Sequence, residues 1–194
     1  MEIFRWQNNK FLEIQKHITT RLKNNKMKTK LSPIAAGTMN WGIRDKNLSS
    51  SEMEHLMNSC IENQITSFNH ADIYGNYTTE SEFGKAFAQS KIDRNKIQLI
   101  SRRGIQHVNC RNNAIKHYEY SKDYIIWSLE NSLKNLQTDY LDVLLFHRPS
   151  PLMVVDEIAD AVAKLKKEGK ITDFGVSNFT TSQTELICQK TEVK

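Results

Sequence analysis

Strand-length apolar runs alternate with amphipathic helical stretches from residue 33 almost to the end of this 194-residue chain. The runs predict strands at residues 34–39, 66–70, 97–102, 140–147 and 171–177. Apolar residues at helical spacing predict a helix after each strand, around residues 53–61, 80–89, 121–136, 156–168 and 181–190. Five strand–helix units in strict alternation predict an α/β fold with a parallel sheet. The alternation alone leaves open whether that sheet closes into a barrel or stays open.

Composition places the chain among soluble globular proteins, with 39% hydrophobic and 25% charged residues. A chain of this length has room for one domain with a core. No apolar run approaches the roughly 20 residues that a membrane span needs. The three cysteines, Cys60, Cys110 and Cys188, show no CxxC or zinc-site spacing. A sparse, odd set of cysteines favours a reducing compartment, so we expect a cytoplasmic protein.

The net charge of +5 is unevenly distributed along the chain. Residues 1–30 hold eight basic and two acidic residues, a net of +6. Residues 31–194 hold nineteen basic and twenty acidic residues, a net of −1. The basic character therefore belongs to the N-terminal segment, which argues against nucleic-acid binding by the domain itself.

The same boundary divides the chain into a basic N-terminal extension, residues 1–30, and one domain, residues 31–194. Five apolar residues in the extension could line one face of a helix: Phe4, Phe11, Ile14, Ile18 and Leu22. That face would suit a membrane-surface or targeting segment. The base rate for chain termini favours a poorly ordered tail instead. Met27 is a hypothetical natural start, which mass spectrometry of the native protein would refute by finding Met1 retained.

Candidate chemical residues stand where the predicted strands end. Tyr74 follows the second strand, Arg102 ends the third, His147 ends the fourth, and Ser177 and Asn178 end the fifth. Barrels and open sheets alike place ligand sites at the carboxyl ends of parallel strands. Each residue also has a plainer interpretation. Tyr74 could be a packing residue of a loop, and His147 could be a buried histidine with satisfied hydrogen bonds. Arg102 could form a basic surface pair with Arg103, and Ser177 and Asn178 could cap the next turn.

Four segments occur together in an order that resembles the aldo-keto reductase family. They are residues 68–75 (FNHADIYG), 99–102 (LISR), 144–149 (LLFHRP) and 174–179 (FGVSNF). The motif series runs from residue 31 to residue 180, about three-quarters of the chain. The tyrosine motif is most similar to a bacterial oxidoreductase branch that reads HADIYG. The resemblance implies a (β/α)8 TIM barrel, of which about five of eight units are present, and the reduction of small carbonyl compounds by NADPH.

The family's catalytic tetrad is Asp, Tyr, Lys and His. A free tyrosine has a pKa near 10, so it is a poor acid until a neighbouring cation lowers that value. By resemblance, Tyr74 is the acid and His147 the histidine that orients the substrate oxygen. Asn69 stands where the family has Asp, and Arg102 stands where it has Lys. Because Arg is not equivalent to Lys and Asn carries no charge, we expect the activation of Tyr74 to fall by about 10²–10⁴-fold.

The resemblance also bears on the cofactor. Ser177 and Asn178 match the family's contacts to the nicotinamide carboxamide. The family's other cofactor contacts lie beyond residue 194, and the chain has neither a GxGxxG motif nor a P-loop. Five strands leave two open sheet edges, which predicts instability, aggregation or self-association. The alternatives are a catalytically inactive remnant, or an interaction or regulatory protein similar to the reductase-like subunits of some potassium channels.

Overall fold

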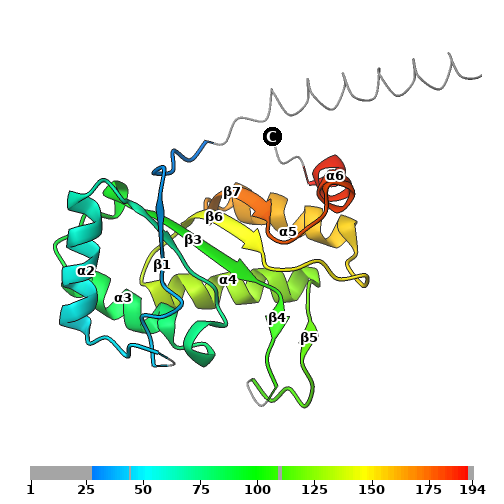
Figure 1. The fold of residues 1–194 in the computed structure, drawn as a ribbon. Coiled ribbons are helices and arrows are strands. Elements are labelled where there is room, and N and C mark those ends of the chain that lie inside the picture. Colours follow the sequence, from blue (N-terminus) through cyan, green and yellow to red (C-terminus); the bar gives the residue numbers. More distant parts are fainter. Residues whose placement is uncertain (1–27, 44, 109–110, 192–194) are drawn as a thin grey trace, which may run out of the picture.

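Five parallel strands form the central sheet of the protein (Figure 1). The computed structural model describes residues 28–43, 45–108 and 111–191. The strands lie in the order β1 (Ala35–Gly37), β2 (Ser67–Asn69), β3 (Gln98–Arg103), β6 (Leu141–Phe146) and β7 (Ile171–Val176). Within the described residues, β1 pairs only with β2, and β7 pairs only with β6. In this part of the chain the sheet therefore has two open edges. The five predicted strands are confirmed, four of them with shorter bounds and β3 shifted by one residue.

A helix follows each of these five strands, as the alternation predicts. The helices are α2 (Ser50–Glu62), α3 (Thr79–Gln89), α4 (Lys122–Leu136), α5 (Val155–Lys167) and α6 (Thr181–Lys190). Local sequence fixes where several of them begin. Ser49 and Glu52 form a capping box at α2, and Thr180 and Gln183 form one at α6. Among the described helices, none is long and apolar enough to cross a membrane.

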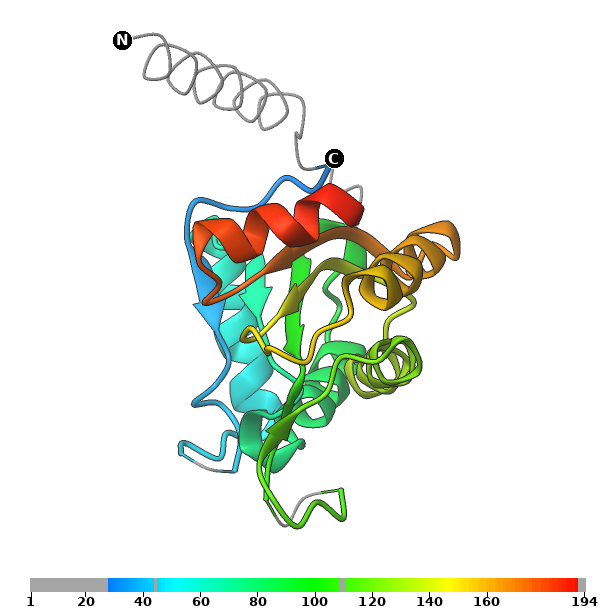
Figure 2. The same cartoon turned by 90° about the vertical axis from the view of Figure 1, so that its right-hand side faces the viewer.

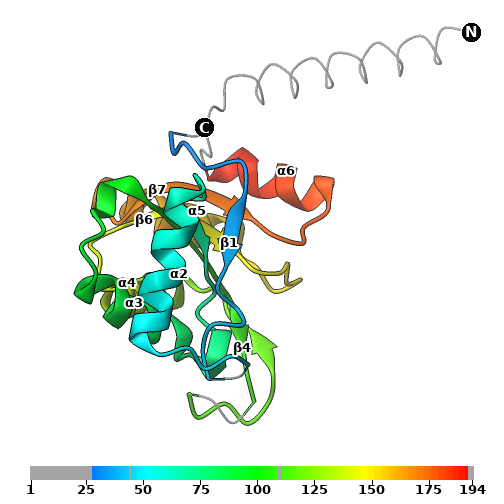
Figure 3. The ribbon, with the colours of Figure 1, turned by 60° about the vertical axis from the view of Figure 1, so that its left-hand side comes forward.

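The hydrophobic core lies between one face of the sheet and helices α2 to α5, and Ile187 of α6 adds to it (Figures 1 and 3). Phe68 in β2 is fully buried, with its ring 5.5 Å from that of Phe83 in α3. Phe146 in β6 is also fully buried, with its ring 4.9 Å from that of Phe174 in β7. Because side chains alternate along a strand, the intervening residues lie on the other face of the sheet.

The segment before β1 crosses the amino ends of the strands. The Thr29 amide donates to Asp173 Oδ2 at 2.7 Å, and the Ser32 amide donates to Ser67 Oγ at 2.9 Å. These bonds fix the segment at β7 and β2, on the end of the sheet away from the candidate site. Residues 1–27 lie outside the described residues, so a poorly ordered extension stays a prediction.

The sequence did not predict a two-stranded antiparallel hairpin between β3 and α4. It consists of β4 (Ile105–Gln106) and β5 (His117–Tyr118), and it projects from the carboxyl end of the sheet (Figure 2). A 3₁₀ turn, η1 (Tyr74–Asn76), follows β2, and a second one, η2 (Arg94–Lys96), precedes β3. The hairpin and η1 lie at the end of the sheet where the candidate residues lie.

Candidate active site

The sequence-predicted residues gather at the carboxyl ends of β2, β3, β6 and β7. The contacts of neighbouring residues show on which face of the sheet each side chain lies. Ser101 and Arg103 bond to residues of α3 and α4, so Arg102 between them lies on the face away from the helices. Phe68 packs against α3, so Asn69 lies on that same inner face. In β6 and β7 this face carries Leu145 and Gly175, since a Cβ built on Gly175 would lie 3.0 Å from Leu145 Cδ2.

Tyr74 and Arg102 are in direct contact. The guanidinium Nη1 donates to the Tyr74 hydroxyl oxygen at 3.2 Å. Tyr74 opens η1, five residues after Asn69, and the turn leaves its hydroxyl within reach of Arg102 in β3. The positive guanidinium therefore lies beside the phenol, where it is placed to stabilise negative charge that develops on that oxygen.

His147 follows β6 directly and is held through its backbone. Its amide donates to the Arg103 carbonyl at 2.9 Å, and its own carbonyl accepts from Asn178 Nδ2 at 2.9 Å. Burial, together with the positive charges of Arg102, Arg148 and His107, lowers the pKa of His147 to about 4. The imidazole is therefore neutral near pH 7 and can orient an oxygen without carrying a charge.

The ion pair of the family's tetrad has no counterpart in the described residues. Asn69 Oδ1 is buried without a hydrogen-bond partner, and so is Arg102 Nε. Asp72 does not replace the missing carboxylate, because its side chain, 1% exposed, pairs with Arg111 at 3.3 Å. The charge of Arg102 thus lacks an acidic partner in the described part of the chain.

A buried polar cluster on the helix-facing side was missed by sequence reasoning. Glu80 in α3 accepts from Ser101 Oγ at 2.6 Å and from Ser132 Oγ at 2.5 Å. Arg103 Nη1 donates to Ser132 Oγ at 2.8 Å. Arg103 is therefore a core residue, 1% exposed, and not half of a basic pair on a rim. Strand alternation could have predicted this, because Arg103 follows Arg102 in β3 and must point to the opposite face of the sheet.

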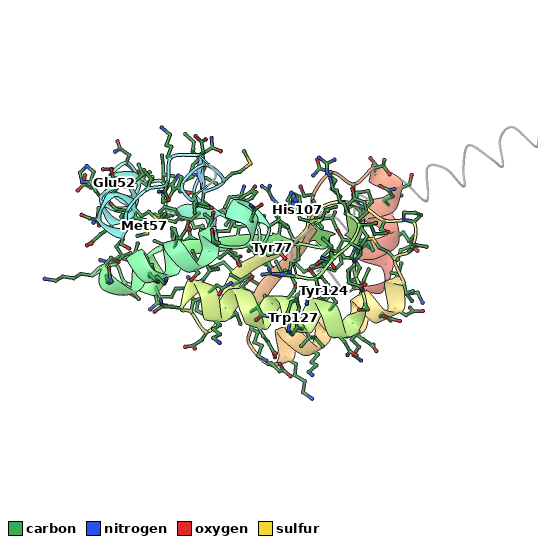
Figure 4. The ribbon with its side chains drawn as sticks, turned by 90° about the horizontal axis from the view of Figure 1, so that it is seen from below. Glu52, Met57, Tyr77, His107, Tyr124 and Trp127 are labelled. Carbon is green, nitrogen blue, oxygen red and sulfur yellow. The ribbon has the colours of Figure 1, made fainter. Side chains whose placement is uncertain are left out.

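Arg111 ties the hairpin segment to the domain. Its guanidinium carbon lies 3.8 Å from the centre of the Tyr77 ring and 5.0 Å from that of Trp127. Figure 4 shows Trp127 and Tyr124 on α4, with Tyr77 nearby. Burial raises the pKa of Asp72 to about 6, while the charges of Arg103 and Arg111 act in the opposite direction. Arg111 thus joins a buried carboxylate to two aromatic rings.

Ser177 and Asn178 are placed to complement an amide. Asn178 Nδ2 donates to His147 O and to Ser177 Oγ, the latter at 3.0 Å, which leaves Asn178 Oδ1 as an acceptor. The Ser177 hydroxyl, which accepts that bond, keeps its own proton to donate. One donor and one acceptor, side by side next to His147, fit a carboxamide such as that of nicotinamide.

Comparisons with known proteins identify the family of the chain. Residues 33–194 match the model of the aldo/keto reductase family. The chain belongs to that family. Oxidoreductase YdhF of Escherichia coli (strain K12) is 42% identical over 147 residues, 76% of this chain and 49% of the relative. The 6-dehydroglucose reductase of Agrobacterium fabrum is 35% identical over 158 residues, 78% of this chain and 52% of the relative.

The solved structures support the fold of this reductase-family chain. The holo form of aldo-keto reductase AKR11C1 from Bacillus halodurans matches with a TM-score of 0.72 and 25% identity. The match covers 86% of this chain and 52% of that one. The expected barrel type is confirmed, and the described sheet supplies five of its strands. The chain spans about half the length of the curated relatives it matches.

Proposed function

We propose that this chain is a reductase-type oxidoreductase that reduces small carbonyl compounds with NADPH through Tyr74 and His147, with strongly reduced turnover. The contact between Tyr74 Oη and Arg102 Nη1, next to a neutral His147, is the observation that carries the proposal. Family membership, the reductase names of the relatives and the holo form of the matched structure support the reaction type. A cytoplasmic location belongs to the same proposal.

In this mechanism the chain positions the substrate oxygen and supplies the proton. Tyr74 donates its hydroxyl proton to the alkoxide that forms, and Arg102 stabilises the phenolate left behind. Neutral His147 orients the oxygen beside Tyr74. Ser177 and Asn178 would hold the nicotinamide carboxamide, and NADPH, when bound, would supply the hydride.

The reduced turnover follows from Asn69 and Arg102. Asn69 brings no charge to neutralise the guanidinium, and its Oδ1 makes no hydrogen bond to it. A planar guanidinium also differs in size and donor geometry from an ammonium group. We expect proton transfer from Tyr74 to be about 10²–10⁴-fold slower than with the family's Asp–Lys pair. The same two residues favour the alternative proposal, a catalytically inactive protein that acts by binding.

Self-association is proposed as well, with a second copy of this chain as the partner. Apolar side chains flank the open edge at β1, and Ile34 and Met39 are 65% and 56% exposed. An open, apolar strand edge pairs readily with another strand. Association across this edge would cover both the backbone groups of β1 and these side chains.

NADPH titration of the full-length chain tests the enzymatic proposal. We expect saturable quenching or enhancement of nucleotide fluorescence and slow carbonyl reduction at saturating NADPH. Tyr74→Phe should lower turnover at least tenfold with unchanged nucleotide affinity, since it removes only the proton donor. Tyr118→Phe makes the same chemical change at a half-exposed tyrosine of β5 and should leave turnover unchanged. Absence of nucleotide binding at millimolar NADPH by soluble chain would refute the enzymatic proposal.

A further inference from the structure

The carboxyl end of the sheet carries positive charge that the described residues leave unbalanced. Arg102, Arg148 and His107 each lower the pKa of His147 through their positive charge. Neither Arg102 nor Arg148 forms an ion pair in the described part of the chain. We propose that this site binds a small oxyanion, the carboxylate or phosphate group of a small molecule, directly on the Arg102 guanidinium and without a nucleotide.

The Arg102 side chain uses few of its hydrogen-bond donors. One donor is used, on Tyr74 at 3.2 Å, and Nε is buried without a partner. A guanidinium presents its donors as a planar fork that matches the two oxygens of a carboxylate or phosphate. Because Nε is enclosed, an oxyanion would bind the Nη donors that Tyr74 does not use, and it would balance a charged group that is short of partners.

The nearby acids cannot neutralise this charge. Asp72 faces Arg111, Arg103 and Glu80, and its side chain is 1% exposed. Both oxygens of Glu80 accept from serines, on the helix-facing side of β3. Arg102 points to the other side of that strand. Both carboxylates are therefore engaged away from the inner face, and neither is available to balance the charge of Arg102.

The sequence change at residue 69 explains why the ligand would be an anion. By resemblance, an Asp at this position would supply one negative charge next to the cation. Asn69 occupies the same face with an unbonded, buried Oδ1, so the site has one negative charge fewer. The inference rests on the proposed function only in using the same site, since it requires neither NADPH nor hydride transfer.

Calorimetric titration of the full chain in the absence of nucleotide tests this inference, with pyruvate and inorganic phosphate as probes. Sodium chloride at matched ionic strength measures the non-specific background. We expect saturable binding of at least one probe, at least tenfold tighter than chloride. Binding of pyruvate alone would show that the site prefers a planar carboxylate, and binding of phosphate alone would show that it prefers a tetrahedral oxyanion. Binding of both would show that the site accepts either oxyanion.

Three variants separate Arg102 from general basicity. Arg102→Gln should weaken binding at least tenfold. Asn69→Asp is nearly isosteric and should weaken it similarly, because an internal carboxylate then competes with the ligand. Lys167→Gln removes one charge from the exposed end of α5, near the amino ends of the strands, and should change nothing. Side-chain Nε–Hε resonances of arginine should show one signal that shifts with the probe and is missing in Arg102→Gln.

Binding that does not saturate, or that persists unchanged in Arg102→Gln and Asn69→Asp, would overturn the inference. Measuring carbonyl turnover of the double variant Asn69→Asp/Arg102→Lys distinguishes the enzymatic proposal from the oxyanion site. A gain of NADPH-dependent turnover in that variant, with loss of oxyanion binding, supports both. Oxyanion binding by the unmodified chain without NADPH binding refutes the enzymatic proposal and leaves this inference standing.

Discussion

Asp72 shows at the scale of one residue how burial makes stability depend on pH. Its pKa is raised to about 6 in the folded chain, against an ordinary value of 3.8, chiefly because it is removed from water. The folded state therefore binds the proton more tightly than the unfolded state between these values. The contribution of this group to stability is therefore fully present below about pH 3.8 and is lost as the pH rises to about 6.

The isosteric change Asp72→Asn should abolish this dependence. A pKa difference of about two units corresponds to roughly 3 kcal/mol. We expect the variant to gain up to roughly 2–3 kcal/mol on the unmodified chain when the pH of urea unfolding is raised from 4 to 8. Asp139→Asn, at an exposed position, should show no such relative gain. Parallel pH profiles for Asp72→Asn and the unmodified chain would contradict the explanation.

Much of the candidate site was open to prediction residue by residue. Tyr74, Arg102, His147 and Ser177 each follow or end a strand that the apolar runs predict, and parallel strands end on one edge. The unbonded state of Asn69 and the burial of Arg103 were not predictable in this way. They depend on which side chains of α3 and α4 reach the sheet. The local sequence pattern does not predict how those helices pack.

At the scale of elements, long periodic segments were predictable and short irregular ones were not. Strand β6 is nearly all apolar and α4 buries residues at helical spacing, so both have a clear pattern. The two-residue strands β4 and β5 are too short for alternation to be detected. The turn η1 contains Gly75 at φ 60° and is followed by Tyr77 at φ 72°, so it depends on tertiary contacts such as Tyr77 with Arg111.

The contact between α3 and α4 depends on Gly84. A Cβ at this position would lie 2.0 Å from the Asn135 carbonyl oxygen and 2.8 Å from backbone atoms of Leu136. Gly84→Ala should therefore lower the free energy of unfolding by about 1–3 kcal/mol, although alanine favours a helix more than glycine does. Gly37→Ala, where no heavy atom lies within 4 Å of the added Cβ, is the matched control for urea unfolding. Equal stabilities of the two variants would contradict the close helix contact.

At the scale of the whole molecule, the sheet has one face covered by helices and two edge strands, β1 and β7. Helices α2 to α5 cover one face, and the segment around Thr29 crosses the amino ends of β6 and β7. The edges at β1 and β7 have no partner strand in the described residues. Backbone groups and apolar side chains at such an edge favour pairing with another chain.

Association of two copies should therefore be measurable and should depend on the β1 edge. Sedimentation velocity should show the mean mass rising with concentration, and the thermal midpoint should rise with it, because association stabilises the folded state by mass action. Ile34→Lys places a charge beside β1 and should shift the population to monomer. Leu152→Lys, at an 85% exposed loop residue after β6, makes the same change away from the strand edges and should have no effect. A monomer at every concentration, with a constant thermal midpoint, would show that the open edge is stable by itself, and association that persists in Ile34→Lys would place the contact elsewhere.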